Sequence, residues 1–169
     1  SSAASDVYKR QEMFIDNAGR EINAYEKTRL KLYFADETGE RLVEVTSQPI
    51  VYSSNISMEK LVLEQLIAGP SEEDGEAYPV ISSAAKVLGV TVKDGVCYVN
   101  LDENALTQIG NVTAETEIYA IVNSLAELPN INRVQIAVGG KTDVVFREKV
   151  QLSTAFDRNL DLVYGTEEK

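Results

Sequence analysis

Apolar side chains recur at every second position from Leu30 to Phe34, the period that is typical of a strand with one buried face. Residues 36–39, Asp-Glu-Thr-Gly, are turn formers, and a second alternating segment follows at 42–46. Pro49 ends this segment, because proline cannot continue the hydrogen bonding of an inner strand. The pattern therefore predicts a β-hairpin.

Two later segments carry apolar residues at spacings of three and four, which predicts two amphipathic helices. The first has Ser54 or Ser57 as its N-cap and ends at Gly69, and the second has Thr113 as its N-cap and ends at Pro129. The apolar positions are Met58, Leu61, Val62 and Leu66 in the first helix and Ile118, Ile121, Val122, Leu125 and Leu128 in the second.

Alternation returns between the two helices and after the second. Residues 86–101 alternate on both sides of Asp94-Gly95, a strong tight-turn signal, so they predict a second hairpin. Cys97 shares the apolar phase of this hairpin, which indicates a small core residue. Residues 134–138 predict a further strand, with short edge strands at 144–146 and 150–152.

The predicted order is β-β-α-β-β-α-β. This order indicates an α/β (α+β) two-layer sandwich, with a mixed sheet and two helices on one face. We expect a tether or added arm at residues 1–28, partly helical around Val7–Ile15. The globular domain is expected at residues 29–160 and a polar tail at 161–169. The opening Ser-Ser-Ala-Ala-Ser-Asp is typical of a linker left after upstream sequence is removed.

Composition removes several classes of chemistry. The 169 residues include no histidine, no tryptophan and one cysteine, so histidine-based catalytic pairs, histidine-ligated zinc and an internal disulfide are excluded. With 16 basic and 27 acidic residues the net charge is −11, which disfavours nucleic acid and anionic membrane as partners. We expect no metal and no cofactor.

Carboxylates are the remaining route to catalysis, but nothing in the sequence places a pair of them in a cleft with one raised pKa. We therefore expect no enzyme activity and assign no catalytic residue; a carboxylate-based wall hydrolase is a less favoured alternative. The carboxylate groups weighed for such catalysis are Glu72/Glu73/Asp74, Asp102/Glu103 and Asp157/Asp161.

Two other carboxylates, those of Glu115 and Glu117, fall in the first turn of the second helix, where negative charge interacts favourably with the helix dipole.

The strand phases also predict a polar sheet face, on the side away from the helices. Tyrosine and arginine are favoured at recognition surfaces, so the face is either an ordinary solvated surface or a binding surface. The candidate binding residues are Tyr33, Tyr98, Asn100, Arg133 and Gln135, with Lys31, Thr91 and Lys93 beside them. Open strand edges offer a second route to association, including self-association.

Several segments together resemble a known family. They are Leu-Ile-Ala-Gly-Pro at 66–70, Val-Asn-Leu-Asp at 99–102, Tyr-Ala-Ile-Val-Asn-Ser-Leu at 119–125 and Val-Gln-Ile-Ala-Val at 134–138. In this order and spacing, over about residues 30–160, they resemble the GerMN domain of spore-germination and sporulation lipoproteins.

The resemblance implies an exported, often lipid-anchored domain of the bacterial cell envelope, with a fold similar to ring-building motifs and no catalytic residues to carry over. It implies an interaction or scaffold role in sporulation or germination, with an envelope protein or peptidoglycan as partner. A peptidoglycan-binding or small-ligand module is the alternative. The chain departs from the sporulation member in having one copy of the domain. Cys97 lies within a strand and cannot be the lipidated cysteine, so membrane contact is expected only through an anchor upstream.

Overall fold

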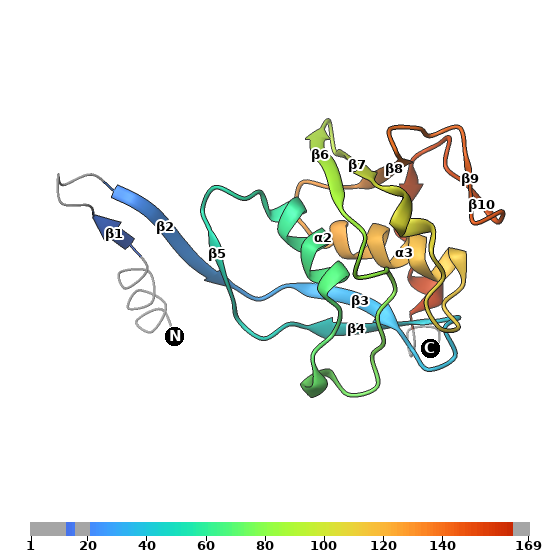
Figure 1. Cartoon of the computed structure of the whole chain (residues 1–169), viewed down its shortest axis with the longest axis horizontal. Helices are drawn as coiled ribbons and strands as arrows, with labels where there is room; N and C mark the ends of the chain where they lie inside the picture. Colours follow the sequence, from blue (N-terminus) through green and yellow to red (C-terminus); the bar gives the residue numbers. More distant parts are fainter. Residues whose placement is uncertain (1–12, 16–20, 164–169) are drawn as a thin grey trace.

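The computed structural model describes residues 13–15 and 21–163, and two α-helices organise it (Figure 1). The helices are α2 (Met58–Ala68) and α3 (Ala114–Leu125), with three 3₁₀ turns at Glu72–Asp74, Glu103–Leu106 and Leu160–Leu162. The strands are β1 (Met13–Ile15), β2 (Glu21–Thr28), β3 (Lys31–Ala35), β4 (Leu42–Thr46), β5 (Ile50–Ser53), β6 (Val87–Lys93), β7 (Val96–Leu101), β8 (Arg133–Val138), β9 (Val145–Phe146), β10 (Val150–Gln151) and β11 (Phe156–Asp157).

The main sheet has four strands in the order β11-β8-β7-β6. Strands β6 and β7 form the predicted antiparallel hairpin, closed by the pair Lys93 and Val96. Strand β8 runs parallel to β7, and α3 lies in the connection between them. Parallel neighbours need such a crossover, because a short turn cannot bring the chain back to the same end of the sheet. The sheet is therefore mixed, as the sequence predicts.

The core lies between this sheet and the helices. Cys97, Val99 and Leu101 of β7 turn their side chains inward, as do Val134 and Ile136 of β8, and all five are buried. Burying each such aliphatic side chain contributes about 1.5–3 kcal/mol. Both helices lie between the four-stranded sheet and the β3–β4 hairpin (Figure 1). The residues that the helices add to the core are Leu61, Val62, Leu63 and Leu66 from α2 and Ile118, Ile121, Val122 and Leu125 from α3.

The helix ends confirm the predicted caps. The Ser57 side chain accepts a hydrogen bond from the Lys60 amide at the start of α2, and Gly69 ends that helix with a φ of 91°. Thr113 accepts from the Thr116 amide at the start of α3. These bonds satisfy amides that have no partner inside the helix, and a left-handed residue such as Gly69 favours glycine.

The mixed α+β class is confirmed, but the strands divide among several sheets and do not form a single one. Strands β3 and β4 form a two-stranded sheet, to which only the single bridges Ala35–Tyr78 and Leu42–Val163 are added among the described residues. The reason lies at the outer edge of β3, where the Tyr33 amide donates to the Ser124 hydroxyl of α3 at 2.9 Å. The helix occupies the position that a further strand would take, so the hairpin cannot join the main sheet.

Strands β1, β2 and β5 form a third sheet, which extends away from the rest of the molecule (Figure 1). The predicted helix around Val7–Ile15 is wrong at Met13–Ile15, which forms β1; the rest of that prediction lies outside the described residues. At the other end Val163, within the expected polar tail, is buried and pairs with Leu42 in a parallel bridge. The domain boundaries themselves stay predictions.

Candidate functional site

The side of the four-stranded sheet that faces away from the helices carries most of the predicted binding residues. Because neighbouring residues of a strand point to opposite faces, the buried positions of β7 and β8 leave Tyr98, Asn100, Arg133 and Gln135 on the outer side. The structure thus brings four of the five predicted residues onto one face. We call this surface, with Thr91 of β6, the outer sheet face.

Tyr98 lies at the centre of the outer sheet face. The strand registers pair Tyr98 with Thr91 on one side and with Gln135 on the other, so the three side chains form one row across β6, β7 and β8. Tyr98 is 44% exposed, which is high for a large aromatic residue in the middle of a sheet. An exposed aromatic ring with a hydroxyl group suits recognition, because it offers apolar area and a hydrogen bond together.

Two residues of the outer sheet face also hold the local structure together. The Asn100 side-chain oxygen accepts a hydrogen bond of 2.7 Å from the Gly140 amide, which fixes the turn after β8. The Gln135 side-chain amide donates to the Leu152 carbonyl at 2.7 Å and so holds the segment after β10. Replacing either residue would disturb the fold as well as the surface, so neither gives a clean test of binding.

Arg133 lies in the row next to Tyr98, at the edge toward β11. Its Nε lies 3.3 Å from the Asp157 carboxylate, and both side chains are more than half exposed. An exposed pair of this kind contributes about 0–1 kcal/mol. The Arg133 guanidinium is therefore available to a partner at little cost.

The structure corrects the prediction for Tyr33. This side chain is 2% exposed and lies in the β3–β4 hairpin, away from the outer sheet face. Its hydroxyl donates a hydrogen bond of 2.7 Å to Glu127, and burial beside this carboxylate raises the pKa of Tyr33 far above its usual value. Strand alternation gives the correct phase, but it cannot show that the loop after α3 covers the polar side of this hairpin.

Lys31 also lies in the β3–β4 hairpin, away from the outer sheet face. Its ammonium lies 3.3 Å from Glu44 and 3.9 Å from Glu127, so it belongs to a small charged cluster over the β3–β4 hairpin. The residues predicted to share one face therefore lie in two places. Tyr33 and Lys31 lie in a cluster at the end of α3, and the other four candidate binding residues lie on the outer sheet face.

Two of the seven carboxylates weighed for hydrolysis, Asp74 and Asp102, bond to backbone amides at the starts of 3₁₀ turns. Asp74 accepts from the Ser71 amide in a capping box, and Asp102 accepts from the amides of Lys86 and Asn104. These bonds organise short turns and leave the carboxylates in solvent-facing loops. Their arrangement gives no reason to assign them to catalysis.

Glu117 lies in the first turn of α3 as the sequence predicts, but its burial is not predicted. It is fully buried, and its Oε1 lies 2.9 Å from Nη1 of Arg147, whose Nη2 donates to the Val112 carbonyl at 2.8 Å. Burial raises the pKa of Glu117 to about 8, and the neighbouring guanidinium offsets only part of this effect. The other oxygen, Oε2, has no hydrogen-bond partner among the described residues. A group this deeply buried cannot touch a substrate, so the pair is structural.

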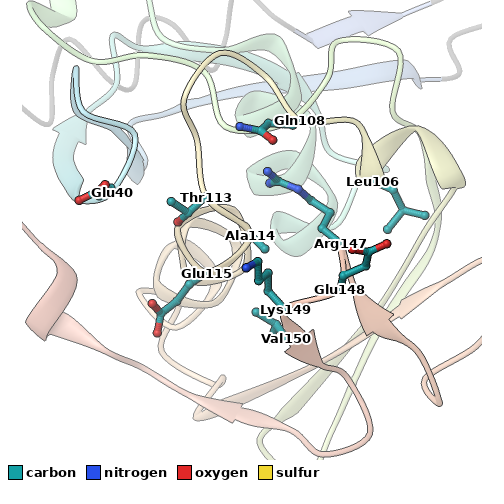
Figure 2. A pocket seen from close by; sticks show the side chains of 10 residues that line it. All are labelled: Glu40, Leu106, Gln108, Thr113, Ala114, Glu115, Arg147, Glu148, Lys149 and Val150. Carbon is teal, nitrogen blue, oxygen red and sulfur yellow. The ribbon is translucent and has the colours of Figure 1, made fainter.

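Arg147 also lines an open pocket of about 920 Å³ (Figure 2). Arg147 and Lys149, from the turn between β9 and β10, face the first turn of α3 across it, and Glu148 points toward Leu106. The two basic side chains are set against the carboxylates of Glu40, Glu115 and Glu148, so the lining has no strong preference for either sign of charge. Arg147 is also already bound to Glu117.

Three further observations bear on function. Cys97 is fully buried, and burial raises the pKa of its thiol to about 12, which makes it an inert core residue as predicted. Among the described residues no group of three or more potential ligands could hold a metal ion. Within the same part of the chain, no helix has the length and apolar character to cross a membrane.

Comparison with known proteins agrees with this fold. Residues 31–144 match the family described as "Germane: Sporulation and spore germination". No curated protein sequence matches the chain.

Solved structures show the same fold. The tandem GerMN domains of the sporulation protein GerM from Bacillus subtilis are 20% identical, with a TM-score of 0.60 over 79% of this chain and 46% of that chain. The chain thus spans about half the length of that protein. Its first GerMN domain alone gives a TM-score of 0.57 at 18% identity, over 79% and 98% of the two chains. A putative lipoprotein from Clostridium perfringens gives 0.55 at 22%, over 78% and 87%.

Proposed function

Because the chain belongs to the Germane family of sporulation and spore germination proteins, we propose that it is a non-enzymatic interaction module of the bacterial cell envelope. In this proposal the outer sheet face holds a protein partner, and the remainder of the domain is a rigid support. The observation that carries the proposal is the row of Thr91, Tyr98 and Gln135, with Arg133 beside it on a solvent-facing sheet.

The support for this face comes from its rigidity and composition. The strands beneath Tyr98 are anchored by the fully buried Cys97 and the buried Val99, so the ring is presented on a fixed backbone. Preformed surfaces bind with less loss of conformational entropy than mobile loops. An exposed tyrosine and an exposed arginine on such a surface are the residue types that most often dominate binding energy.

The extracytoplasmic location is part of the same proposal. A protein of similar fold is described as a putative lipoprotein, and the description of the family names sporulation and spore germination. We therefore expect the domain outside the cytoplasmic membrane, held by an anchor upstream. Added protease should digest the full-length protein in protoplasts whose cytoplasmic proteins stay intact. Protection equal to that of a cytoplasmic protein would contradict the location.

The interaction role is tested in the bacterium that carries the gene. The double variant Tyr98→Ala/Arg133→Ala should fold normally yet lower the yield of heat-resistant or germinating spores toward that of a deletion strain. The control Glu72→Ala/Glu73→Ala changes two exposed residues of a loop far from the outer sheet face and should behave like the wild type. Normal spores from the first variant at normal protein levels would contradict the proposal.

One observation favours the alternative of a peptidoglycan- or small-ligand-binding module. The pocket beside α3 is within the size range of ligand sites, and Lys149 and Gln108 offer donors there. Solubilised peptidoglycan fragments would then release or absorb heat on titration into the domain, and Lys149→Ala would weaken that signal. Absence of binding would leave the outer sheet face as the site.

A further inference from the structure

Strand β6 is the last strand of the four-stranded sheet, and its outer edge is open. The sheet order is β11-β8-β7-β6, and within residues 21–163 only β7 pairs with β6. Open edges matter because each one presents unpaired backbone donors and acceptors to which another strand can bind. The edge lies beside the outer sheet face but is a different surface.

The register shows which backbone groups of β6 point outward. The β6–β7 turn has two residues, Asp94 and Gly95, with φ of 54° and 82°, and the closing pair is Lys93 and Val96. In such a hairpin the closing pair and every second pair from it exchange hydrogen bonds. Thr91 therefore bonds to β7, whereas the amides and carbonyls of Val90 and Val92 face the open edge.

A groove runs along this edge. It has a volume of about 540 Å³ and separates β6 from the start of α2, with Ile56 on the helix side and Leu88 and Val90 on the strand side. Leu88 is 54% exposed, the most of any large hydrophobic residue within residues 25–163. It lies where the register shifts between Val87 and Gly89, so a bulge turns it outward. Apolar side chains thus lie directly beside unpaired backbone groups.

The groove beside this edge is lined by one charged side chain, which is a cation, whereas Asp94 follows Lys93 and the Asp102 carboxylate accepts from the Lys86 amide at the two ends of β6. Lys60 is the one charged residue that lines the groove, Lys86 precedes β6 and Lys93 ends it. Lys60 has Glu64 at 4.0 Å, and because both side chains are about half exposed this pair stabilises little, so a closer carboxylate can replace it. Because no carboxylate lines the groove, Lys60 gives it a local preference for a partner with an acidic side chain, in a chain whose net charge is −11.

We propose that β6 is a strand-addition site for an extended segment of another protein, in which aliphatic side chains alternate with carboxylates. Its backbone pairs with Val90 and Val92, an aliphatic side chain contacts Ile56 and Leu88, and a carboxylate approaches Lys60. A second copy of this chain is disfavoured, because both copies carry a net charge of −11. The inference does not require the outer sheet face to bind anything.

The first test uses a capped seven-residue peptide of alternating valine and glutamate, with a valine–lysine peptide as its matched control. Amide exchange in the ¹⁵N-labelled chain is followed by NMR. The acidic peptide should slow exchange at Val90 and Val92 and leave Thr91 unchanged, since Thr91 is already bonded. The basic peptide should bind about tenfold more weakly. Unaltered amides at millimolar acidic peptide, or equal binding of both peptides, would overturn the proposal.

A backbone variant separates strand addition from simple charge attraction. Val90→Pro removes an outward amide, which an edge strand tolerates, and should abolish binding of the acidic peptide; Val90→Thr keeps the amide and should retain it. If the proline variant does not fold, the peptide is modified in its place. N-methylation of the peptide amides that face β6 should abolish binding, and N-methylation of the amides that face away from β6 is the control. Equal binding by the Val90→Pro and Val90→Thr variants, or by the two methylated peptides, would reject the site. Protection of Val90 and Val92 that grows with protein concentration alone would assign the edge to a second copy and overturn the proposed partner.

Discussion

The Tyr33 hydroxyl donates a 2.7 Å hydrogen bond to Glu127, and this bond connects the β3–β4 hairpin to the segment that follows α3. The backbone amide of Tyr33 also donates a hydrogen bond to the Ser124 hydroxyl of α3. One residue thus fastens the hairpin to α3 through both main chain and side chain. Its role is structural.

Replacing Tyr33 by phenylalanine should therefore lower stability without affecting the outer sheet face. Loss of a partly buried hydrogen bond to a carboxylate should cost about 1–2 kcal/mol in the free energy of unfolding. The measurement is urea denaturation. Tyr98→Phe is the matched control, because that hydroxyl lies on an exposed ring, and it should change the unfolding free energy by less than about 0.5 kcal/mol. Equal stability of the two variants would contradict the assignment.

The buried Glu117 should make stability depend on pH. Its pKa is about 8 in the folded chain against 4.5 for an unperturbed glutamate, so between these values the folded state binds the proton more tightly. The contribution of Glu117 is therefore fully present below pH 4.5 and is lost as the pH rises through 8.

The variant Glu117→Gln isolates this contribution, because an amide of the same shape does not titrate. Unfolding free energies of the wild type and the variant should be measured from about pH 5 to about pH 9. The difference, wild type minus variant, should fall by a few kcal/mol over this range. A difference that stays flat or rises with pH would show that Glu117 is ionised throughout and that Arg147 dominates.

Gly39 should not tolerate a side chain. Its φ is 77°, and an added Cβ would lie 2.2 Å from the backbone oxygen of Asn111, whereas Gly139 has a φ of 59° and open space around it. Both alanine variants carry the backbone strain of about 1–2 kcal/mol, but only Gly39→Ala adds a clash with main-chain atoms. Thermal unfolding should therefore show a clearly lower Tm for Gly39→Ala. Equal melting temperatures would mean that the loop at Asn111 moves aside freely.

The local elements could be read from the sequence because their signals are local. The caps at Ser57 and Thr113, the Asp94-Gly95 turn and the alternation around Cys97 each depend on neighbours within a few residues. The family resemblance also rests on short local segments, at 66–70, 99–102, 119–125 and 134–138, and the family match over residues 31–144 confirms it.

Long-range packing could not be read in the same way. The burial of Tyr33 depends on Glu127, which is 94 residues away, and the burial of Glu117 depends on Arg147, which is 30 residues away. Glu117 lies in a first helical turn, where an exposed acidic residue is the usual case. One signal was available in the sequence of α3. Ala120 and Ser124 are small residues of the kind that close packing favours, and nearly the whole circumference of this helix is buried.

The most direct test of the central claim, that the outer sheet face contacts a protein partner, is site-specific photocrosslinking in the living bacterium. A photoreactive amino acid is placed at Tyr98 in one strain and at Glu73, an exposed loop residue, in the control strain. The account predicts a discrete crosslinked protein at Tyr98 during sporulation or germination that is absent at Glu73 and lost when Arg133→Ala is added. The account is contradicted if Tyr98 gives no adduct or the same adducts as Glu73.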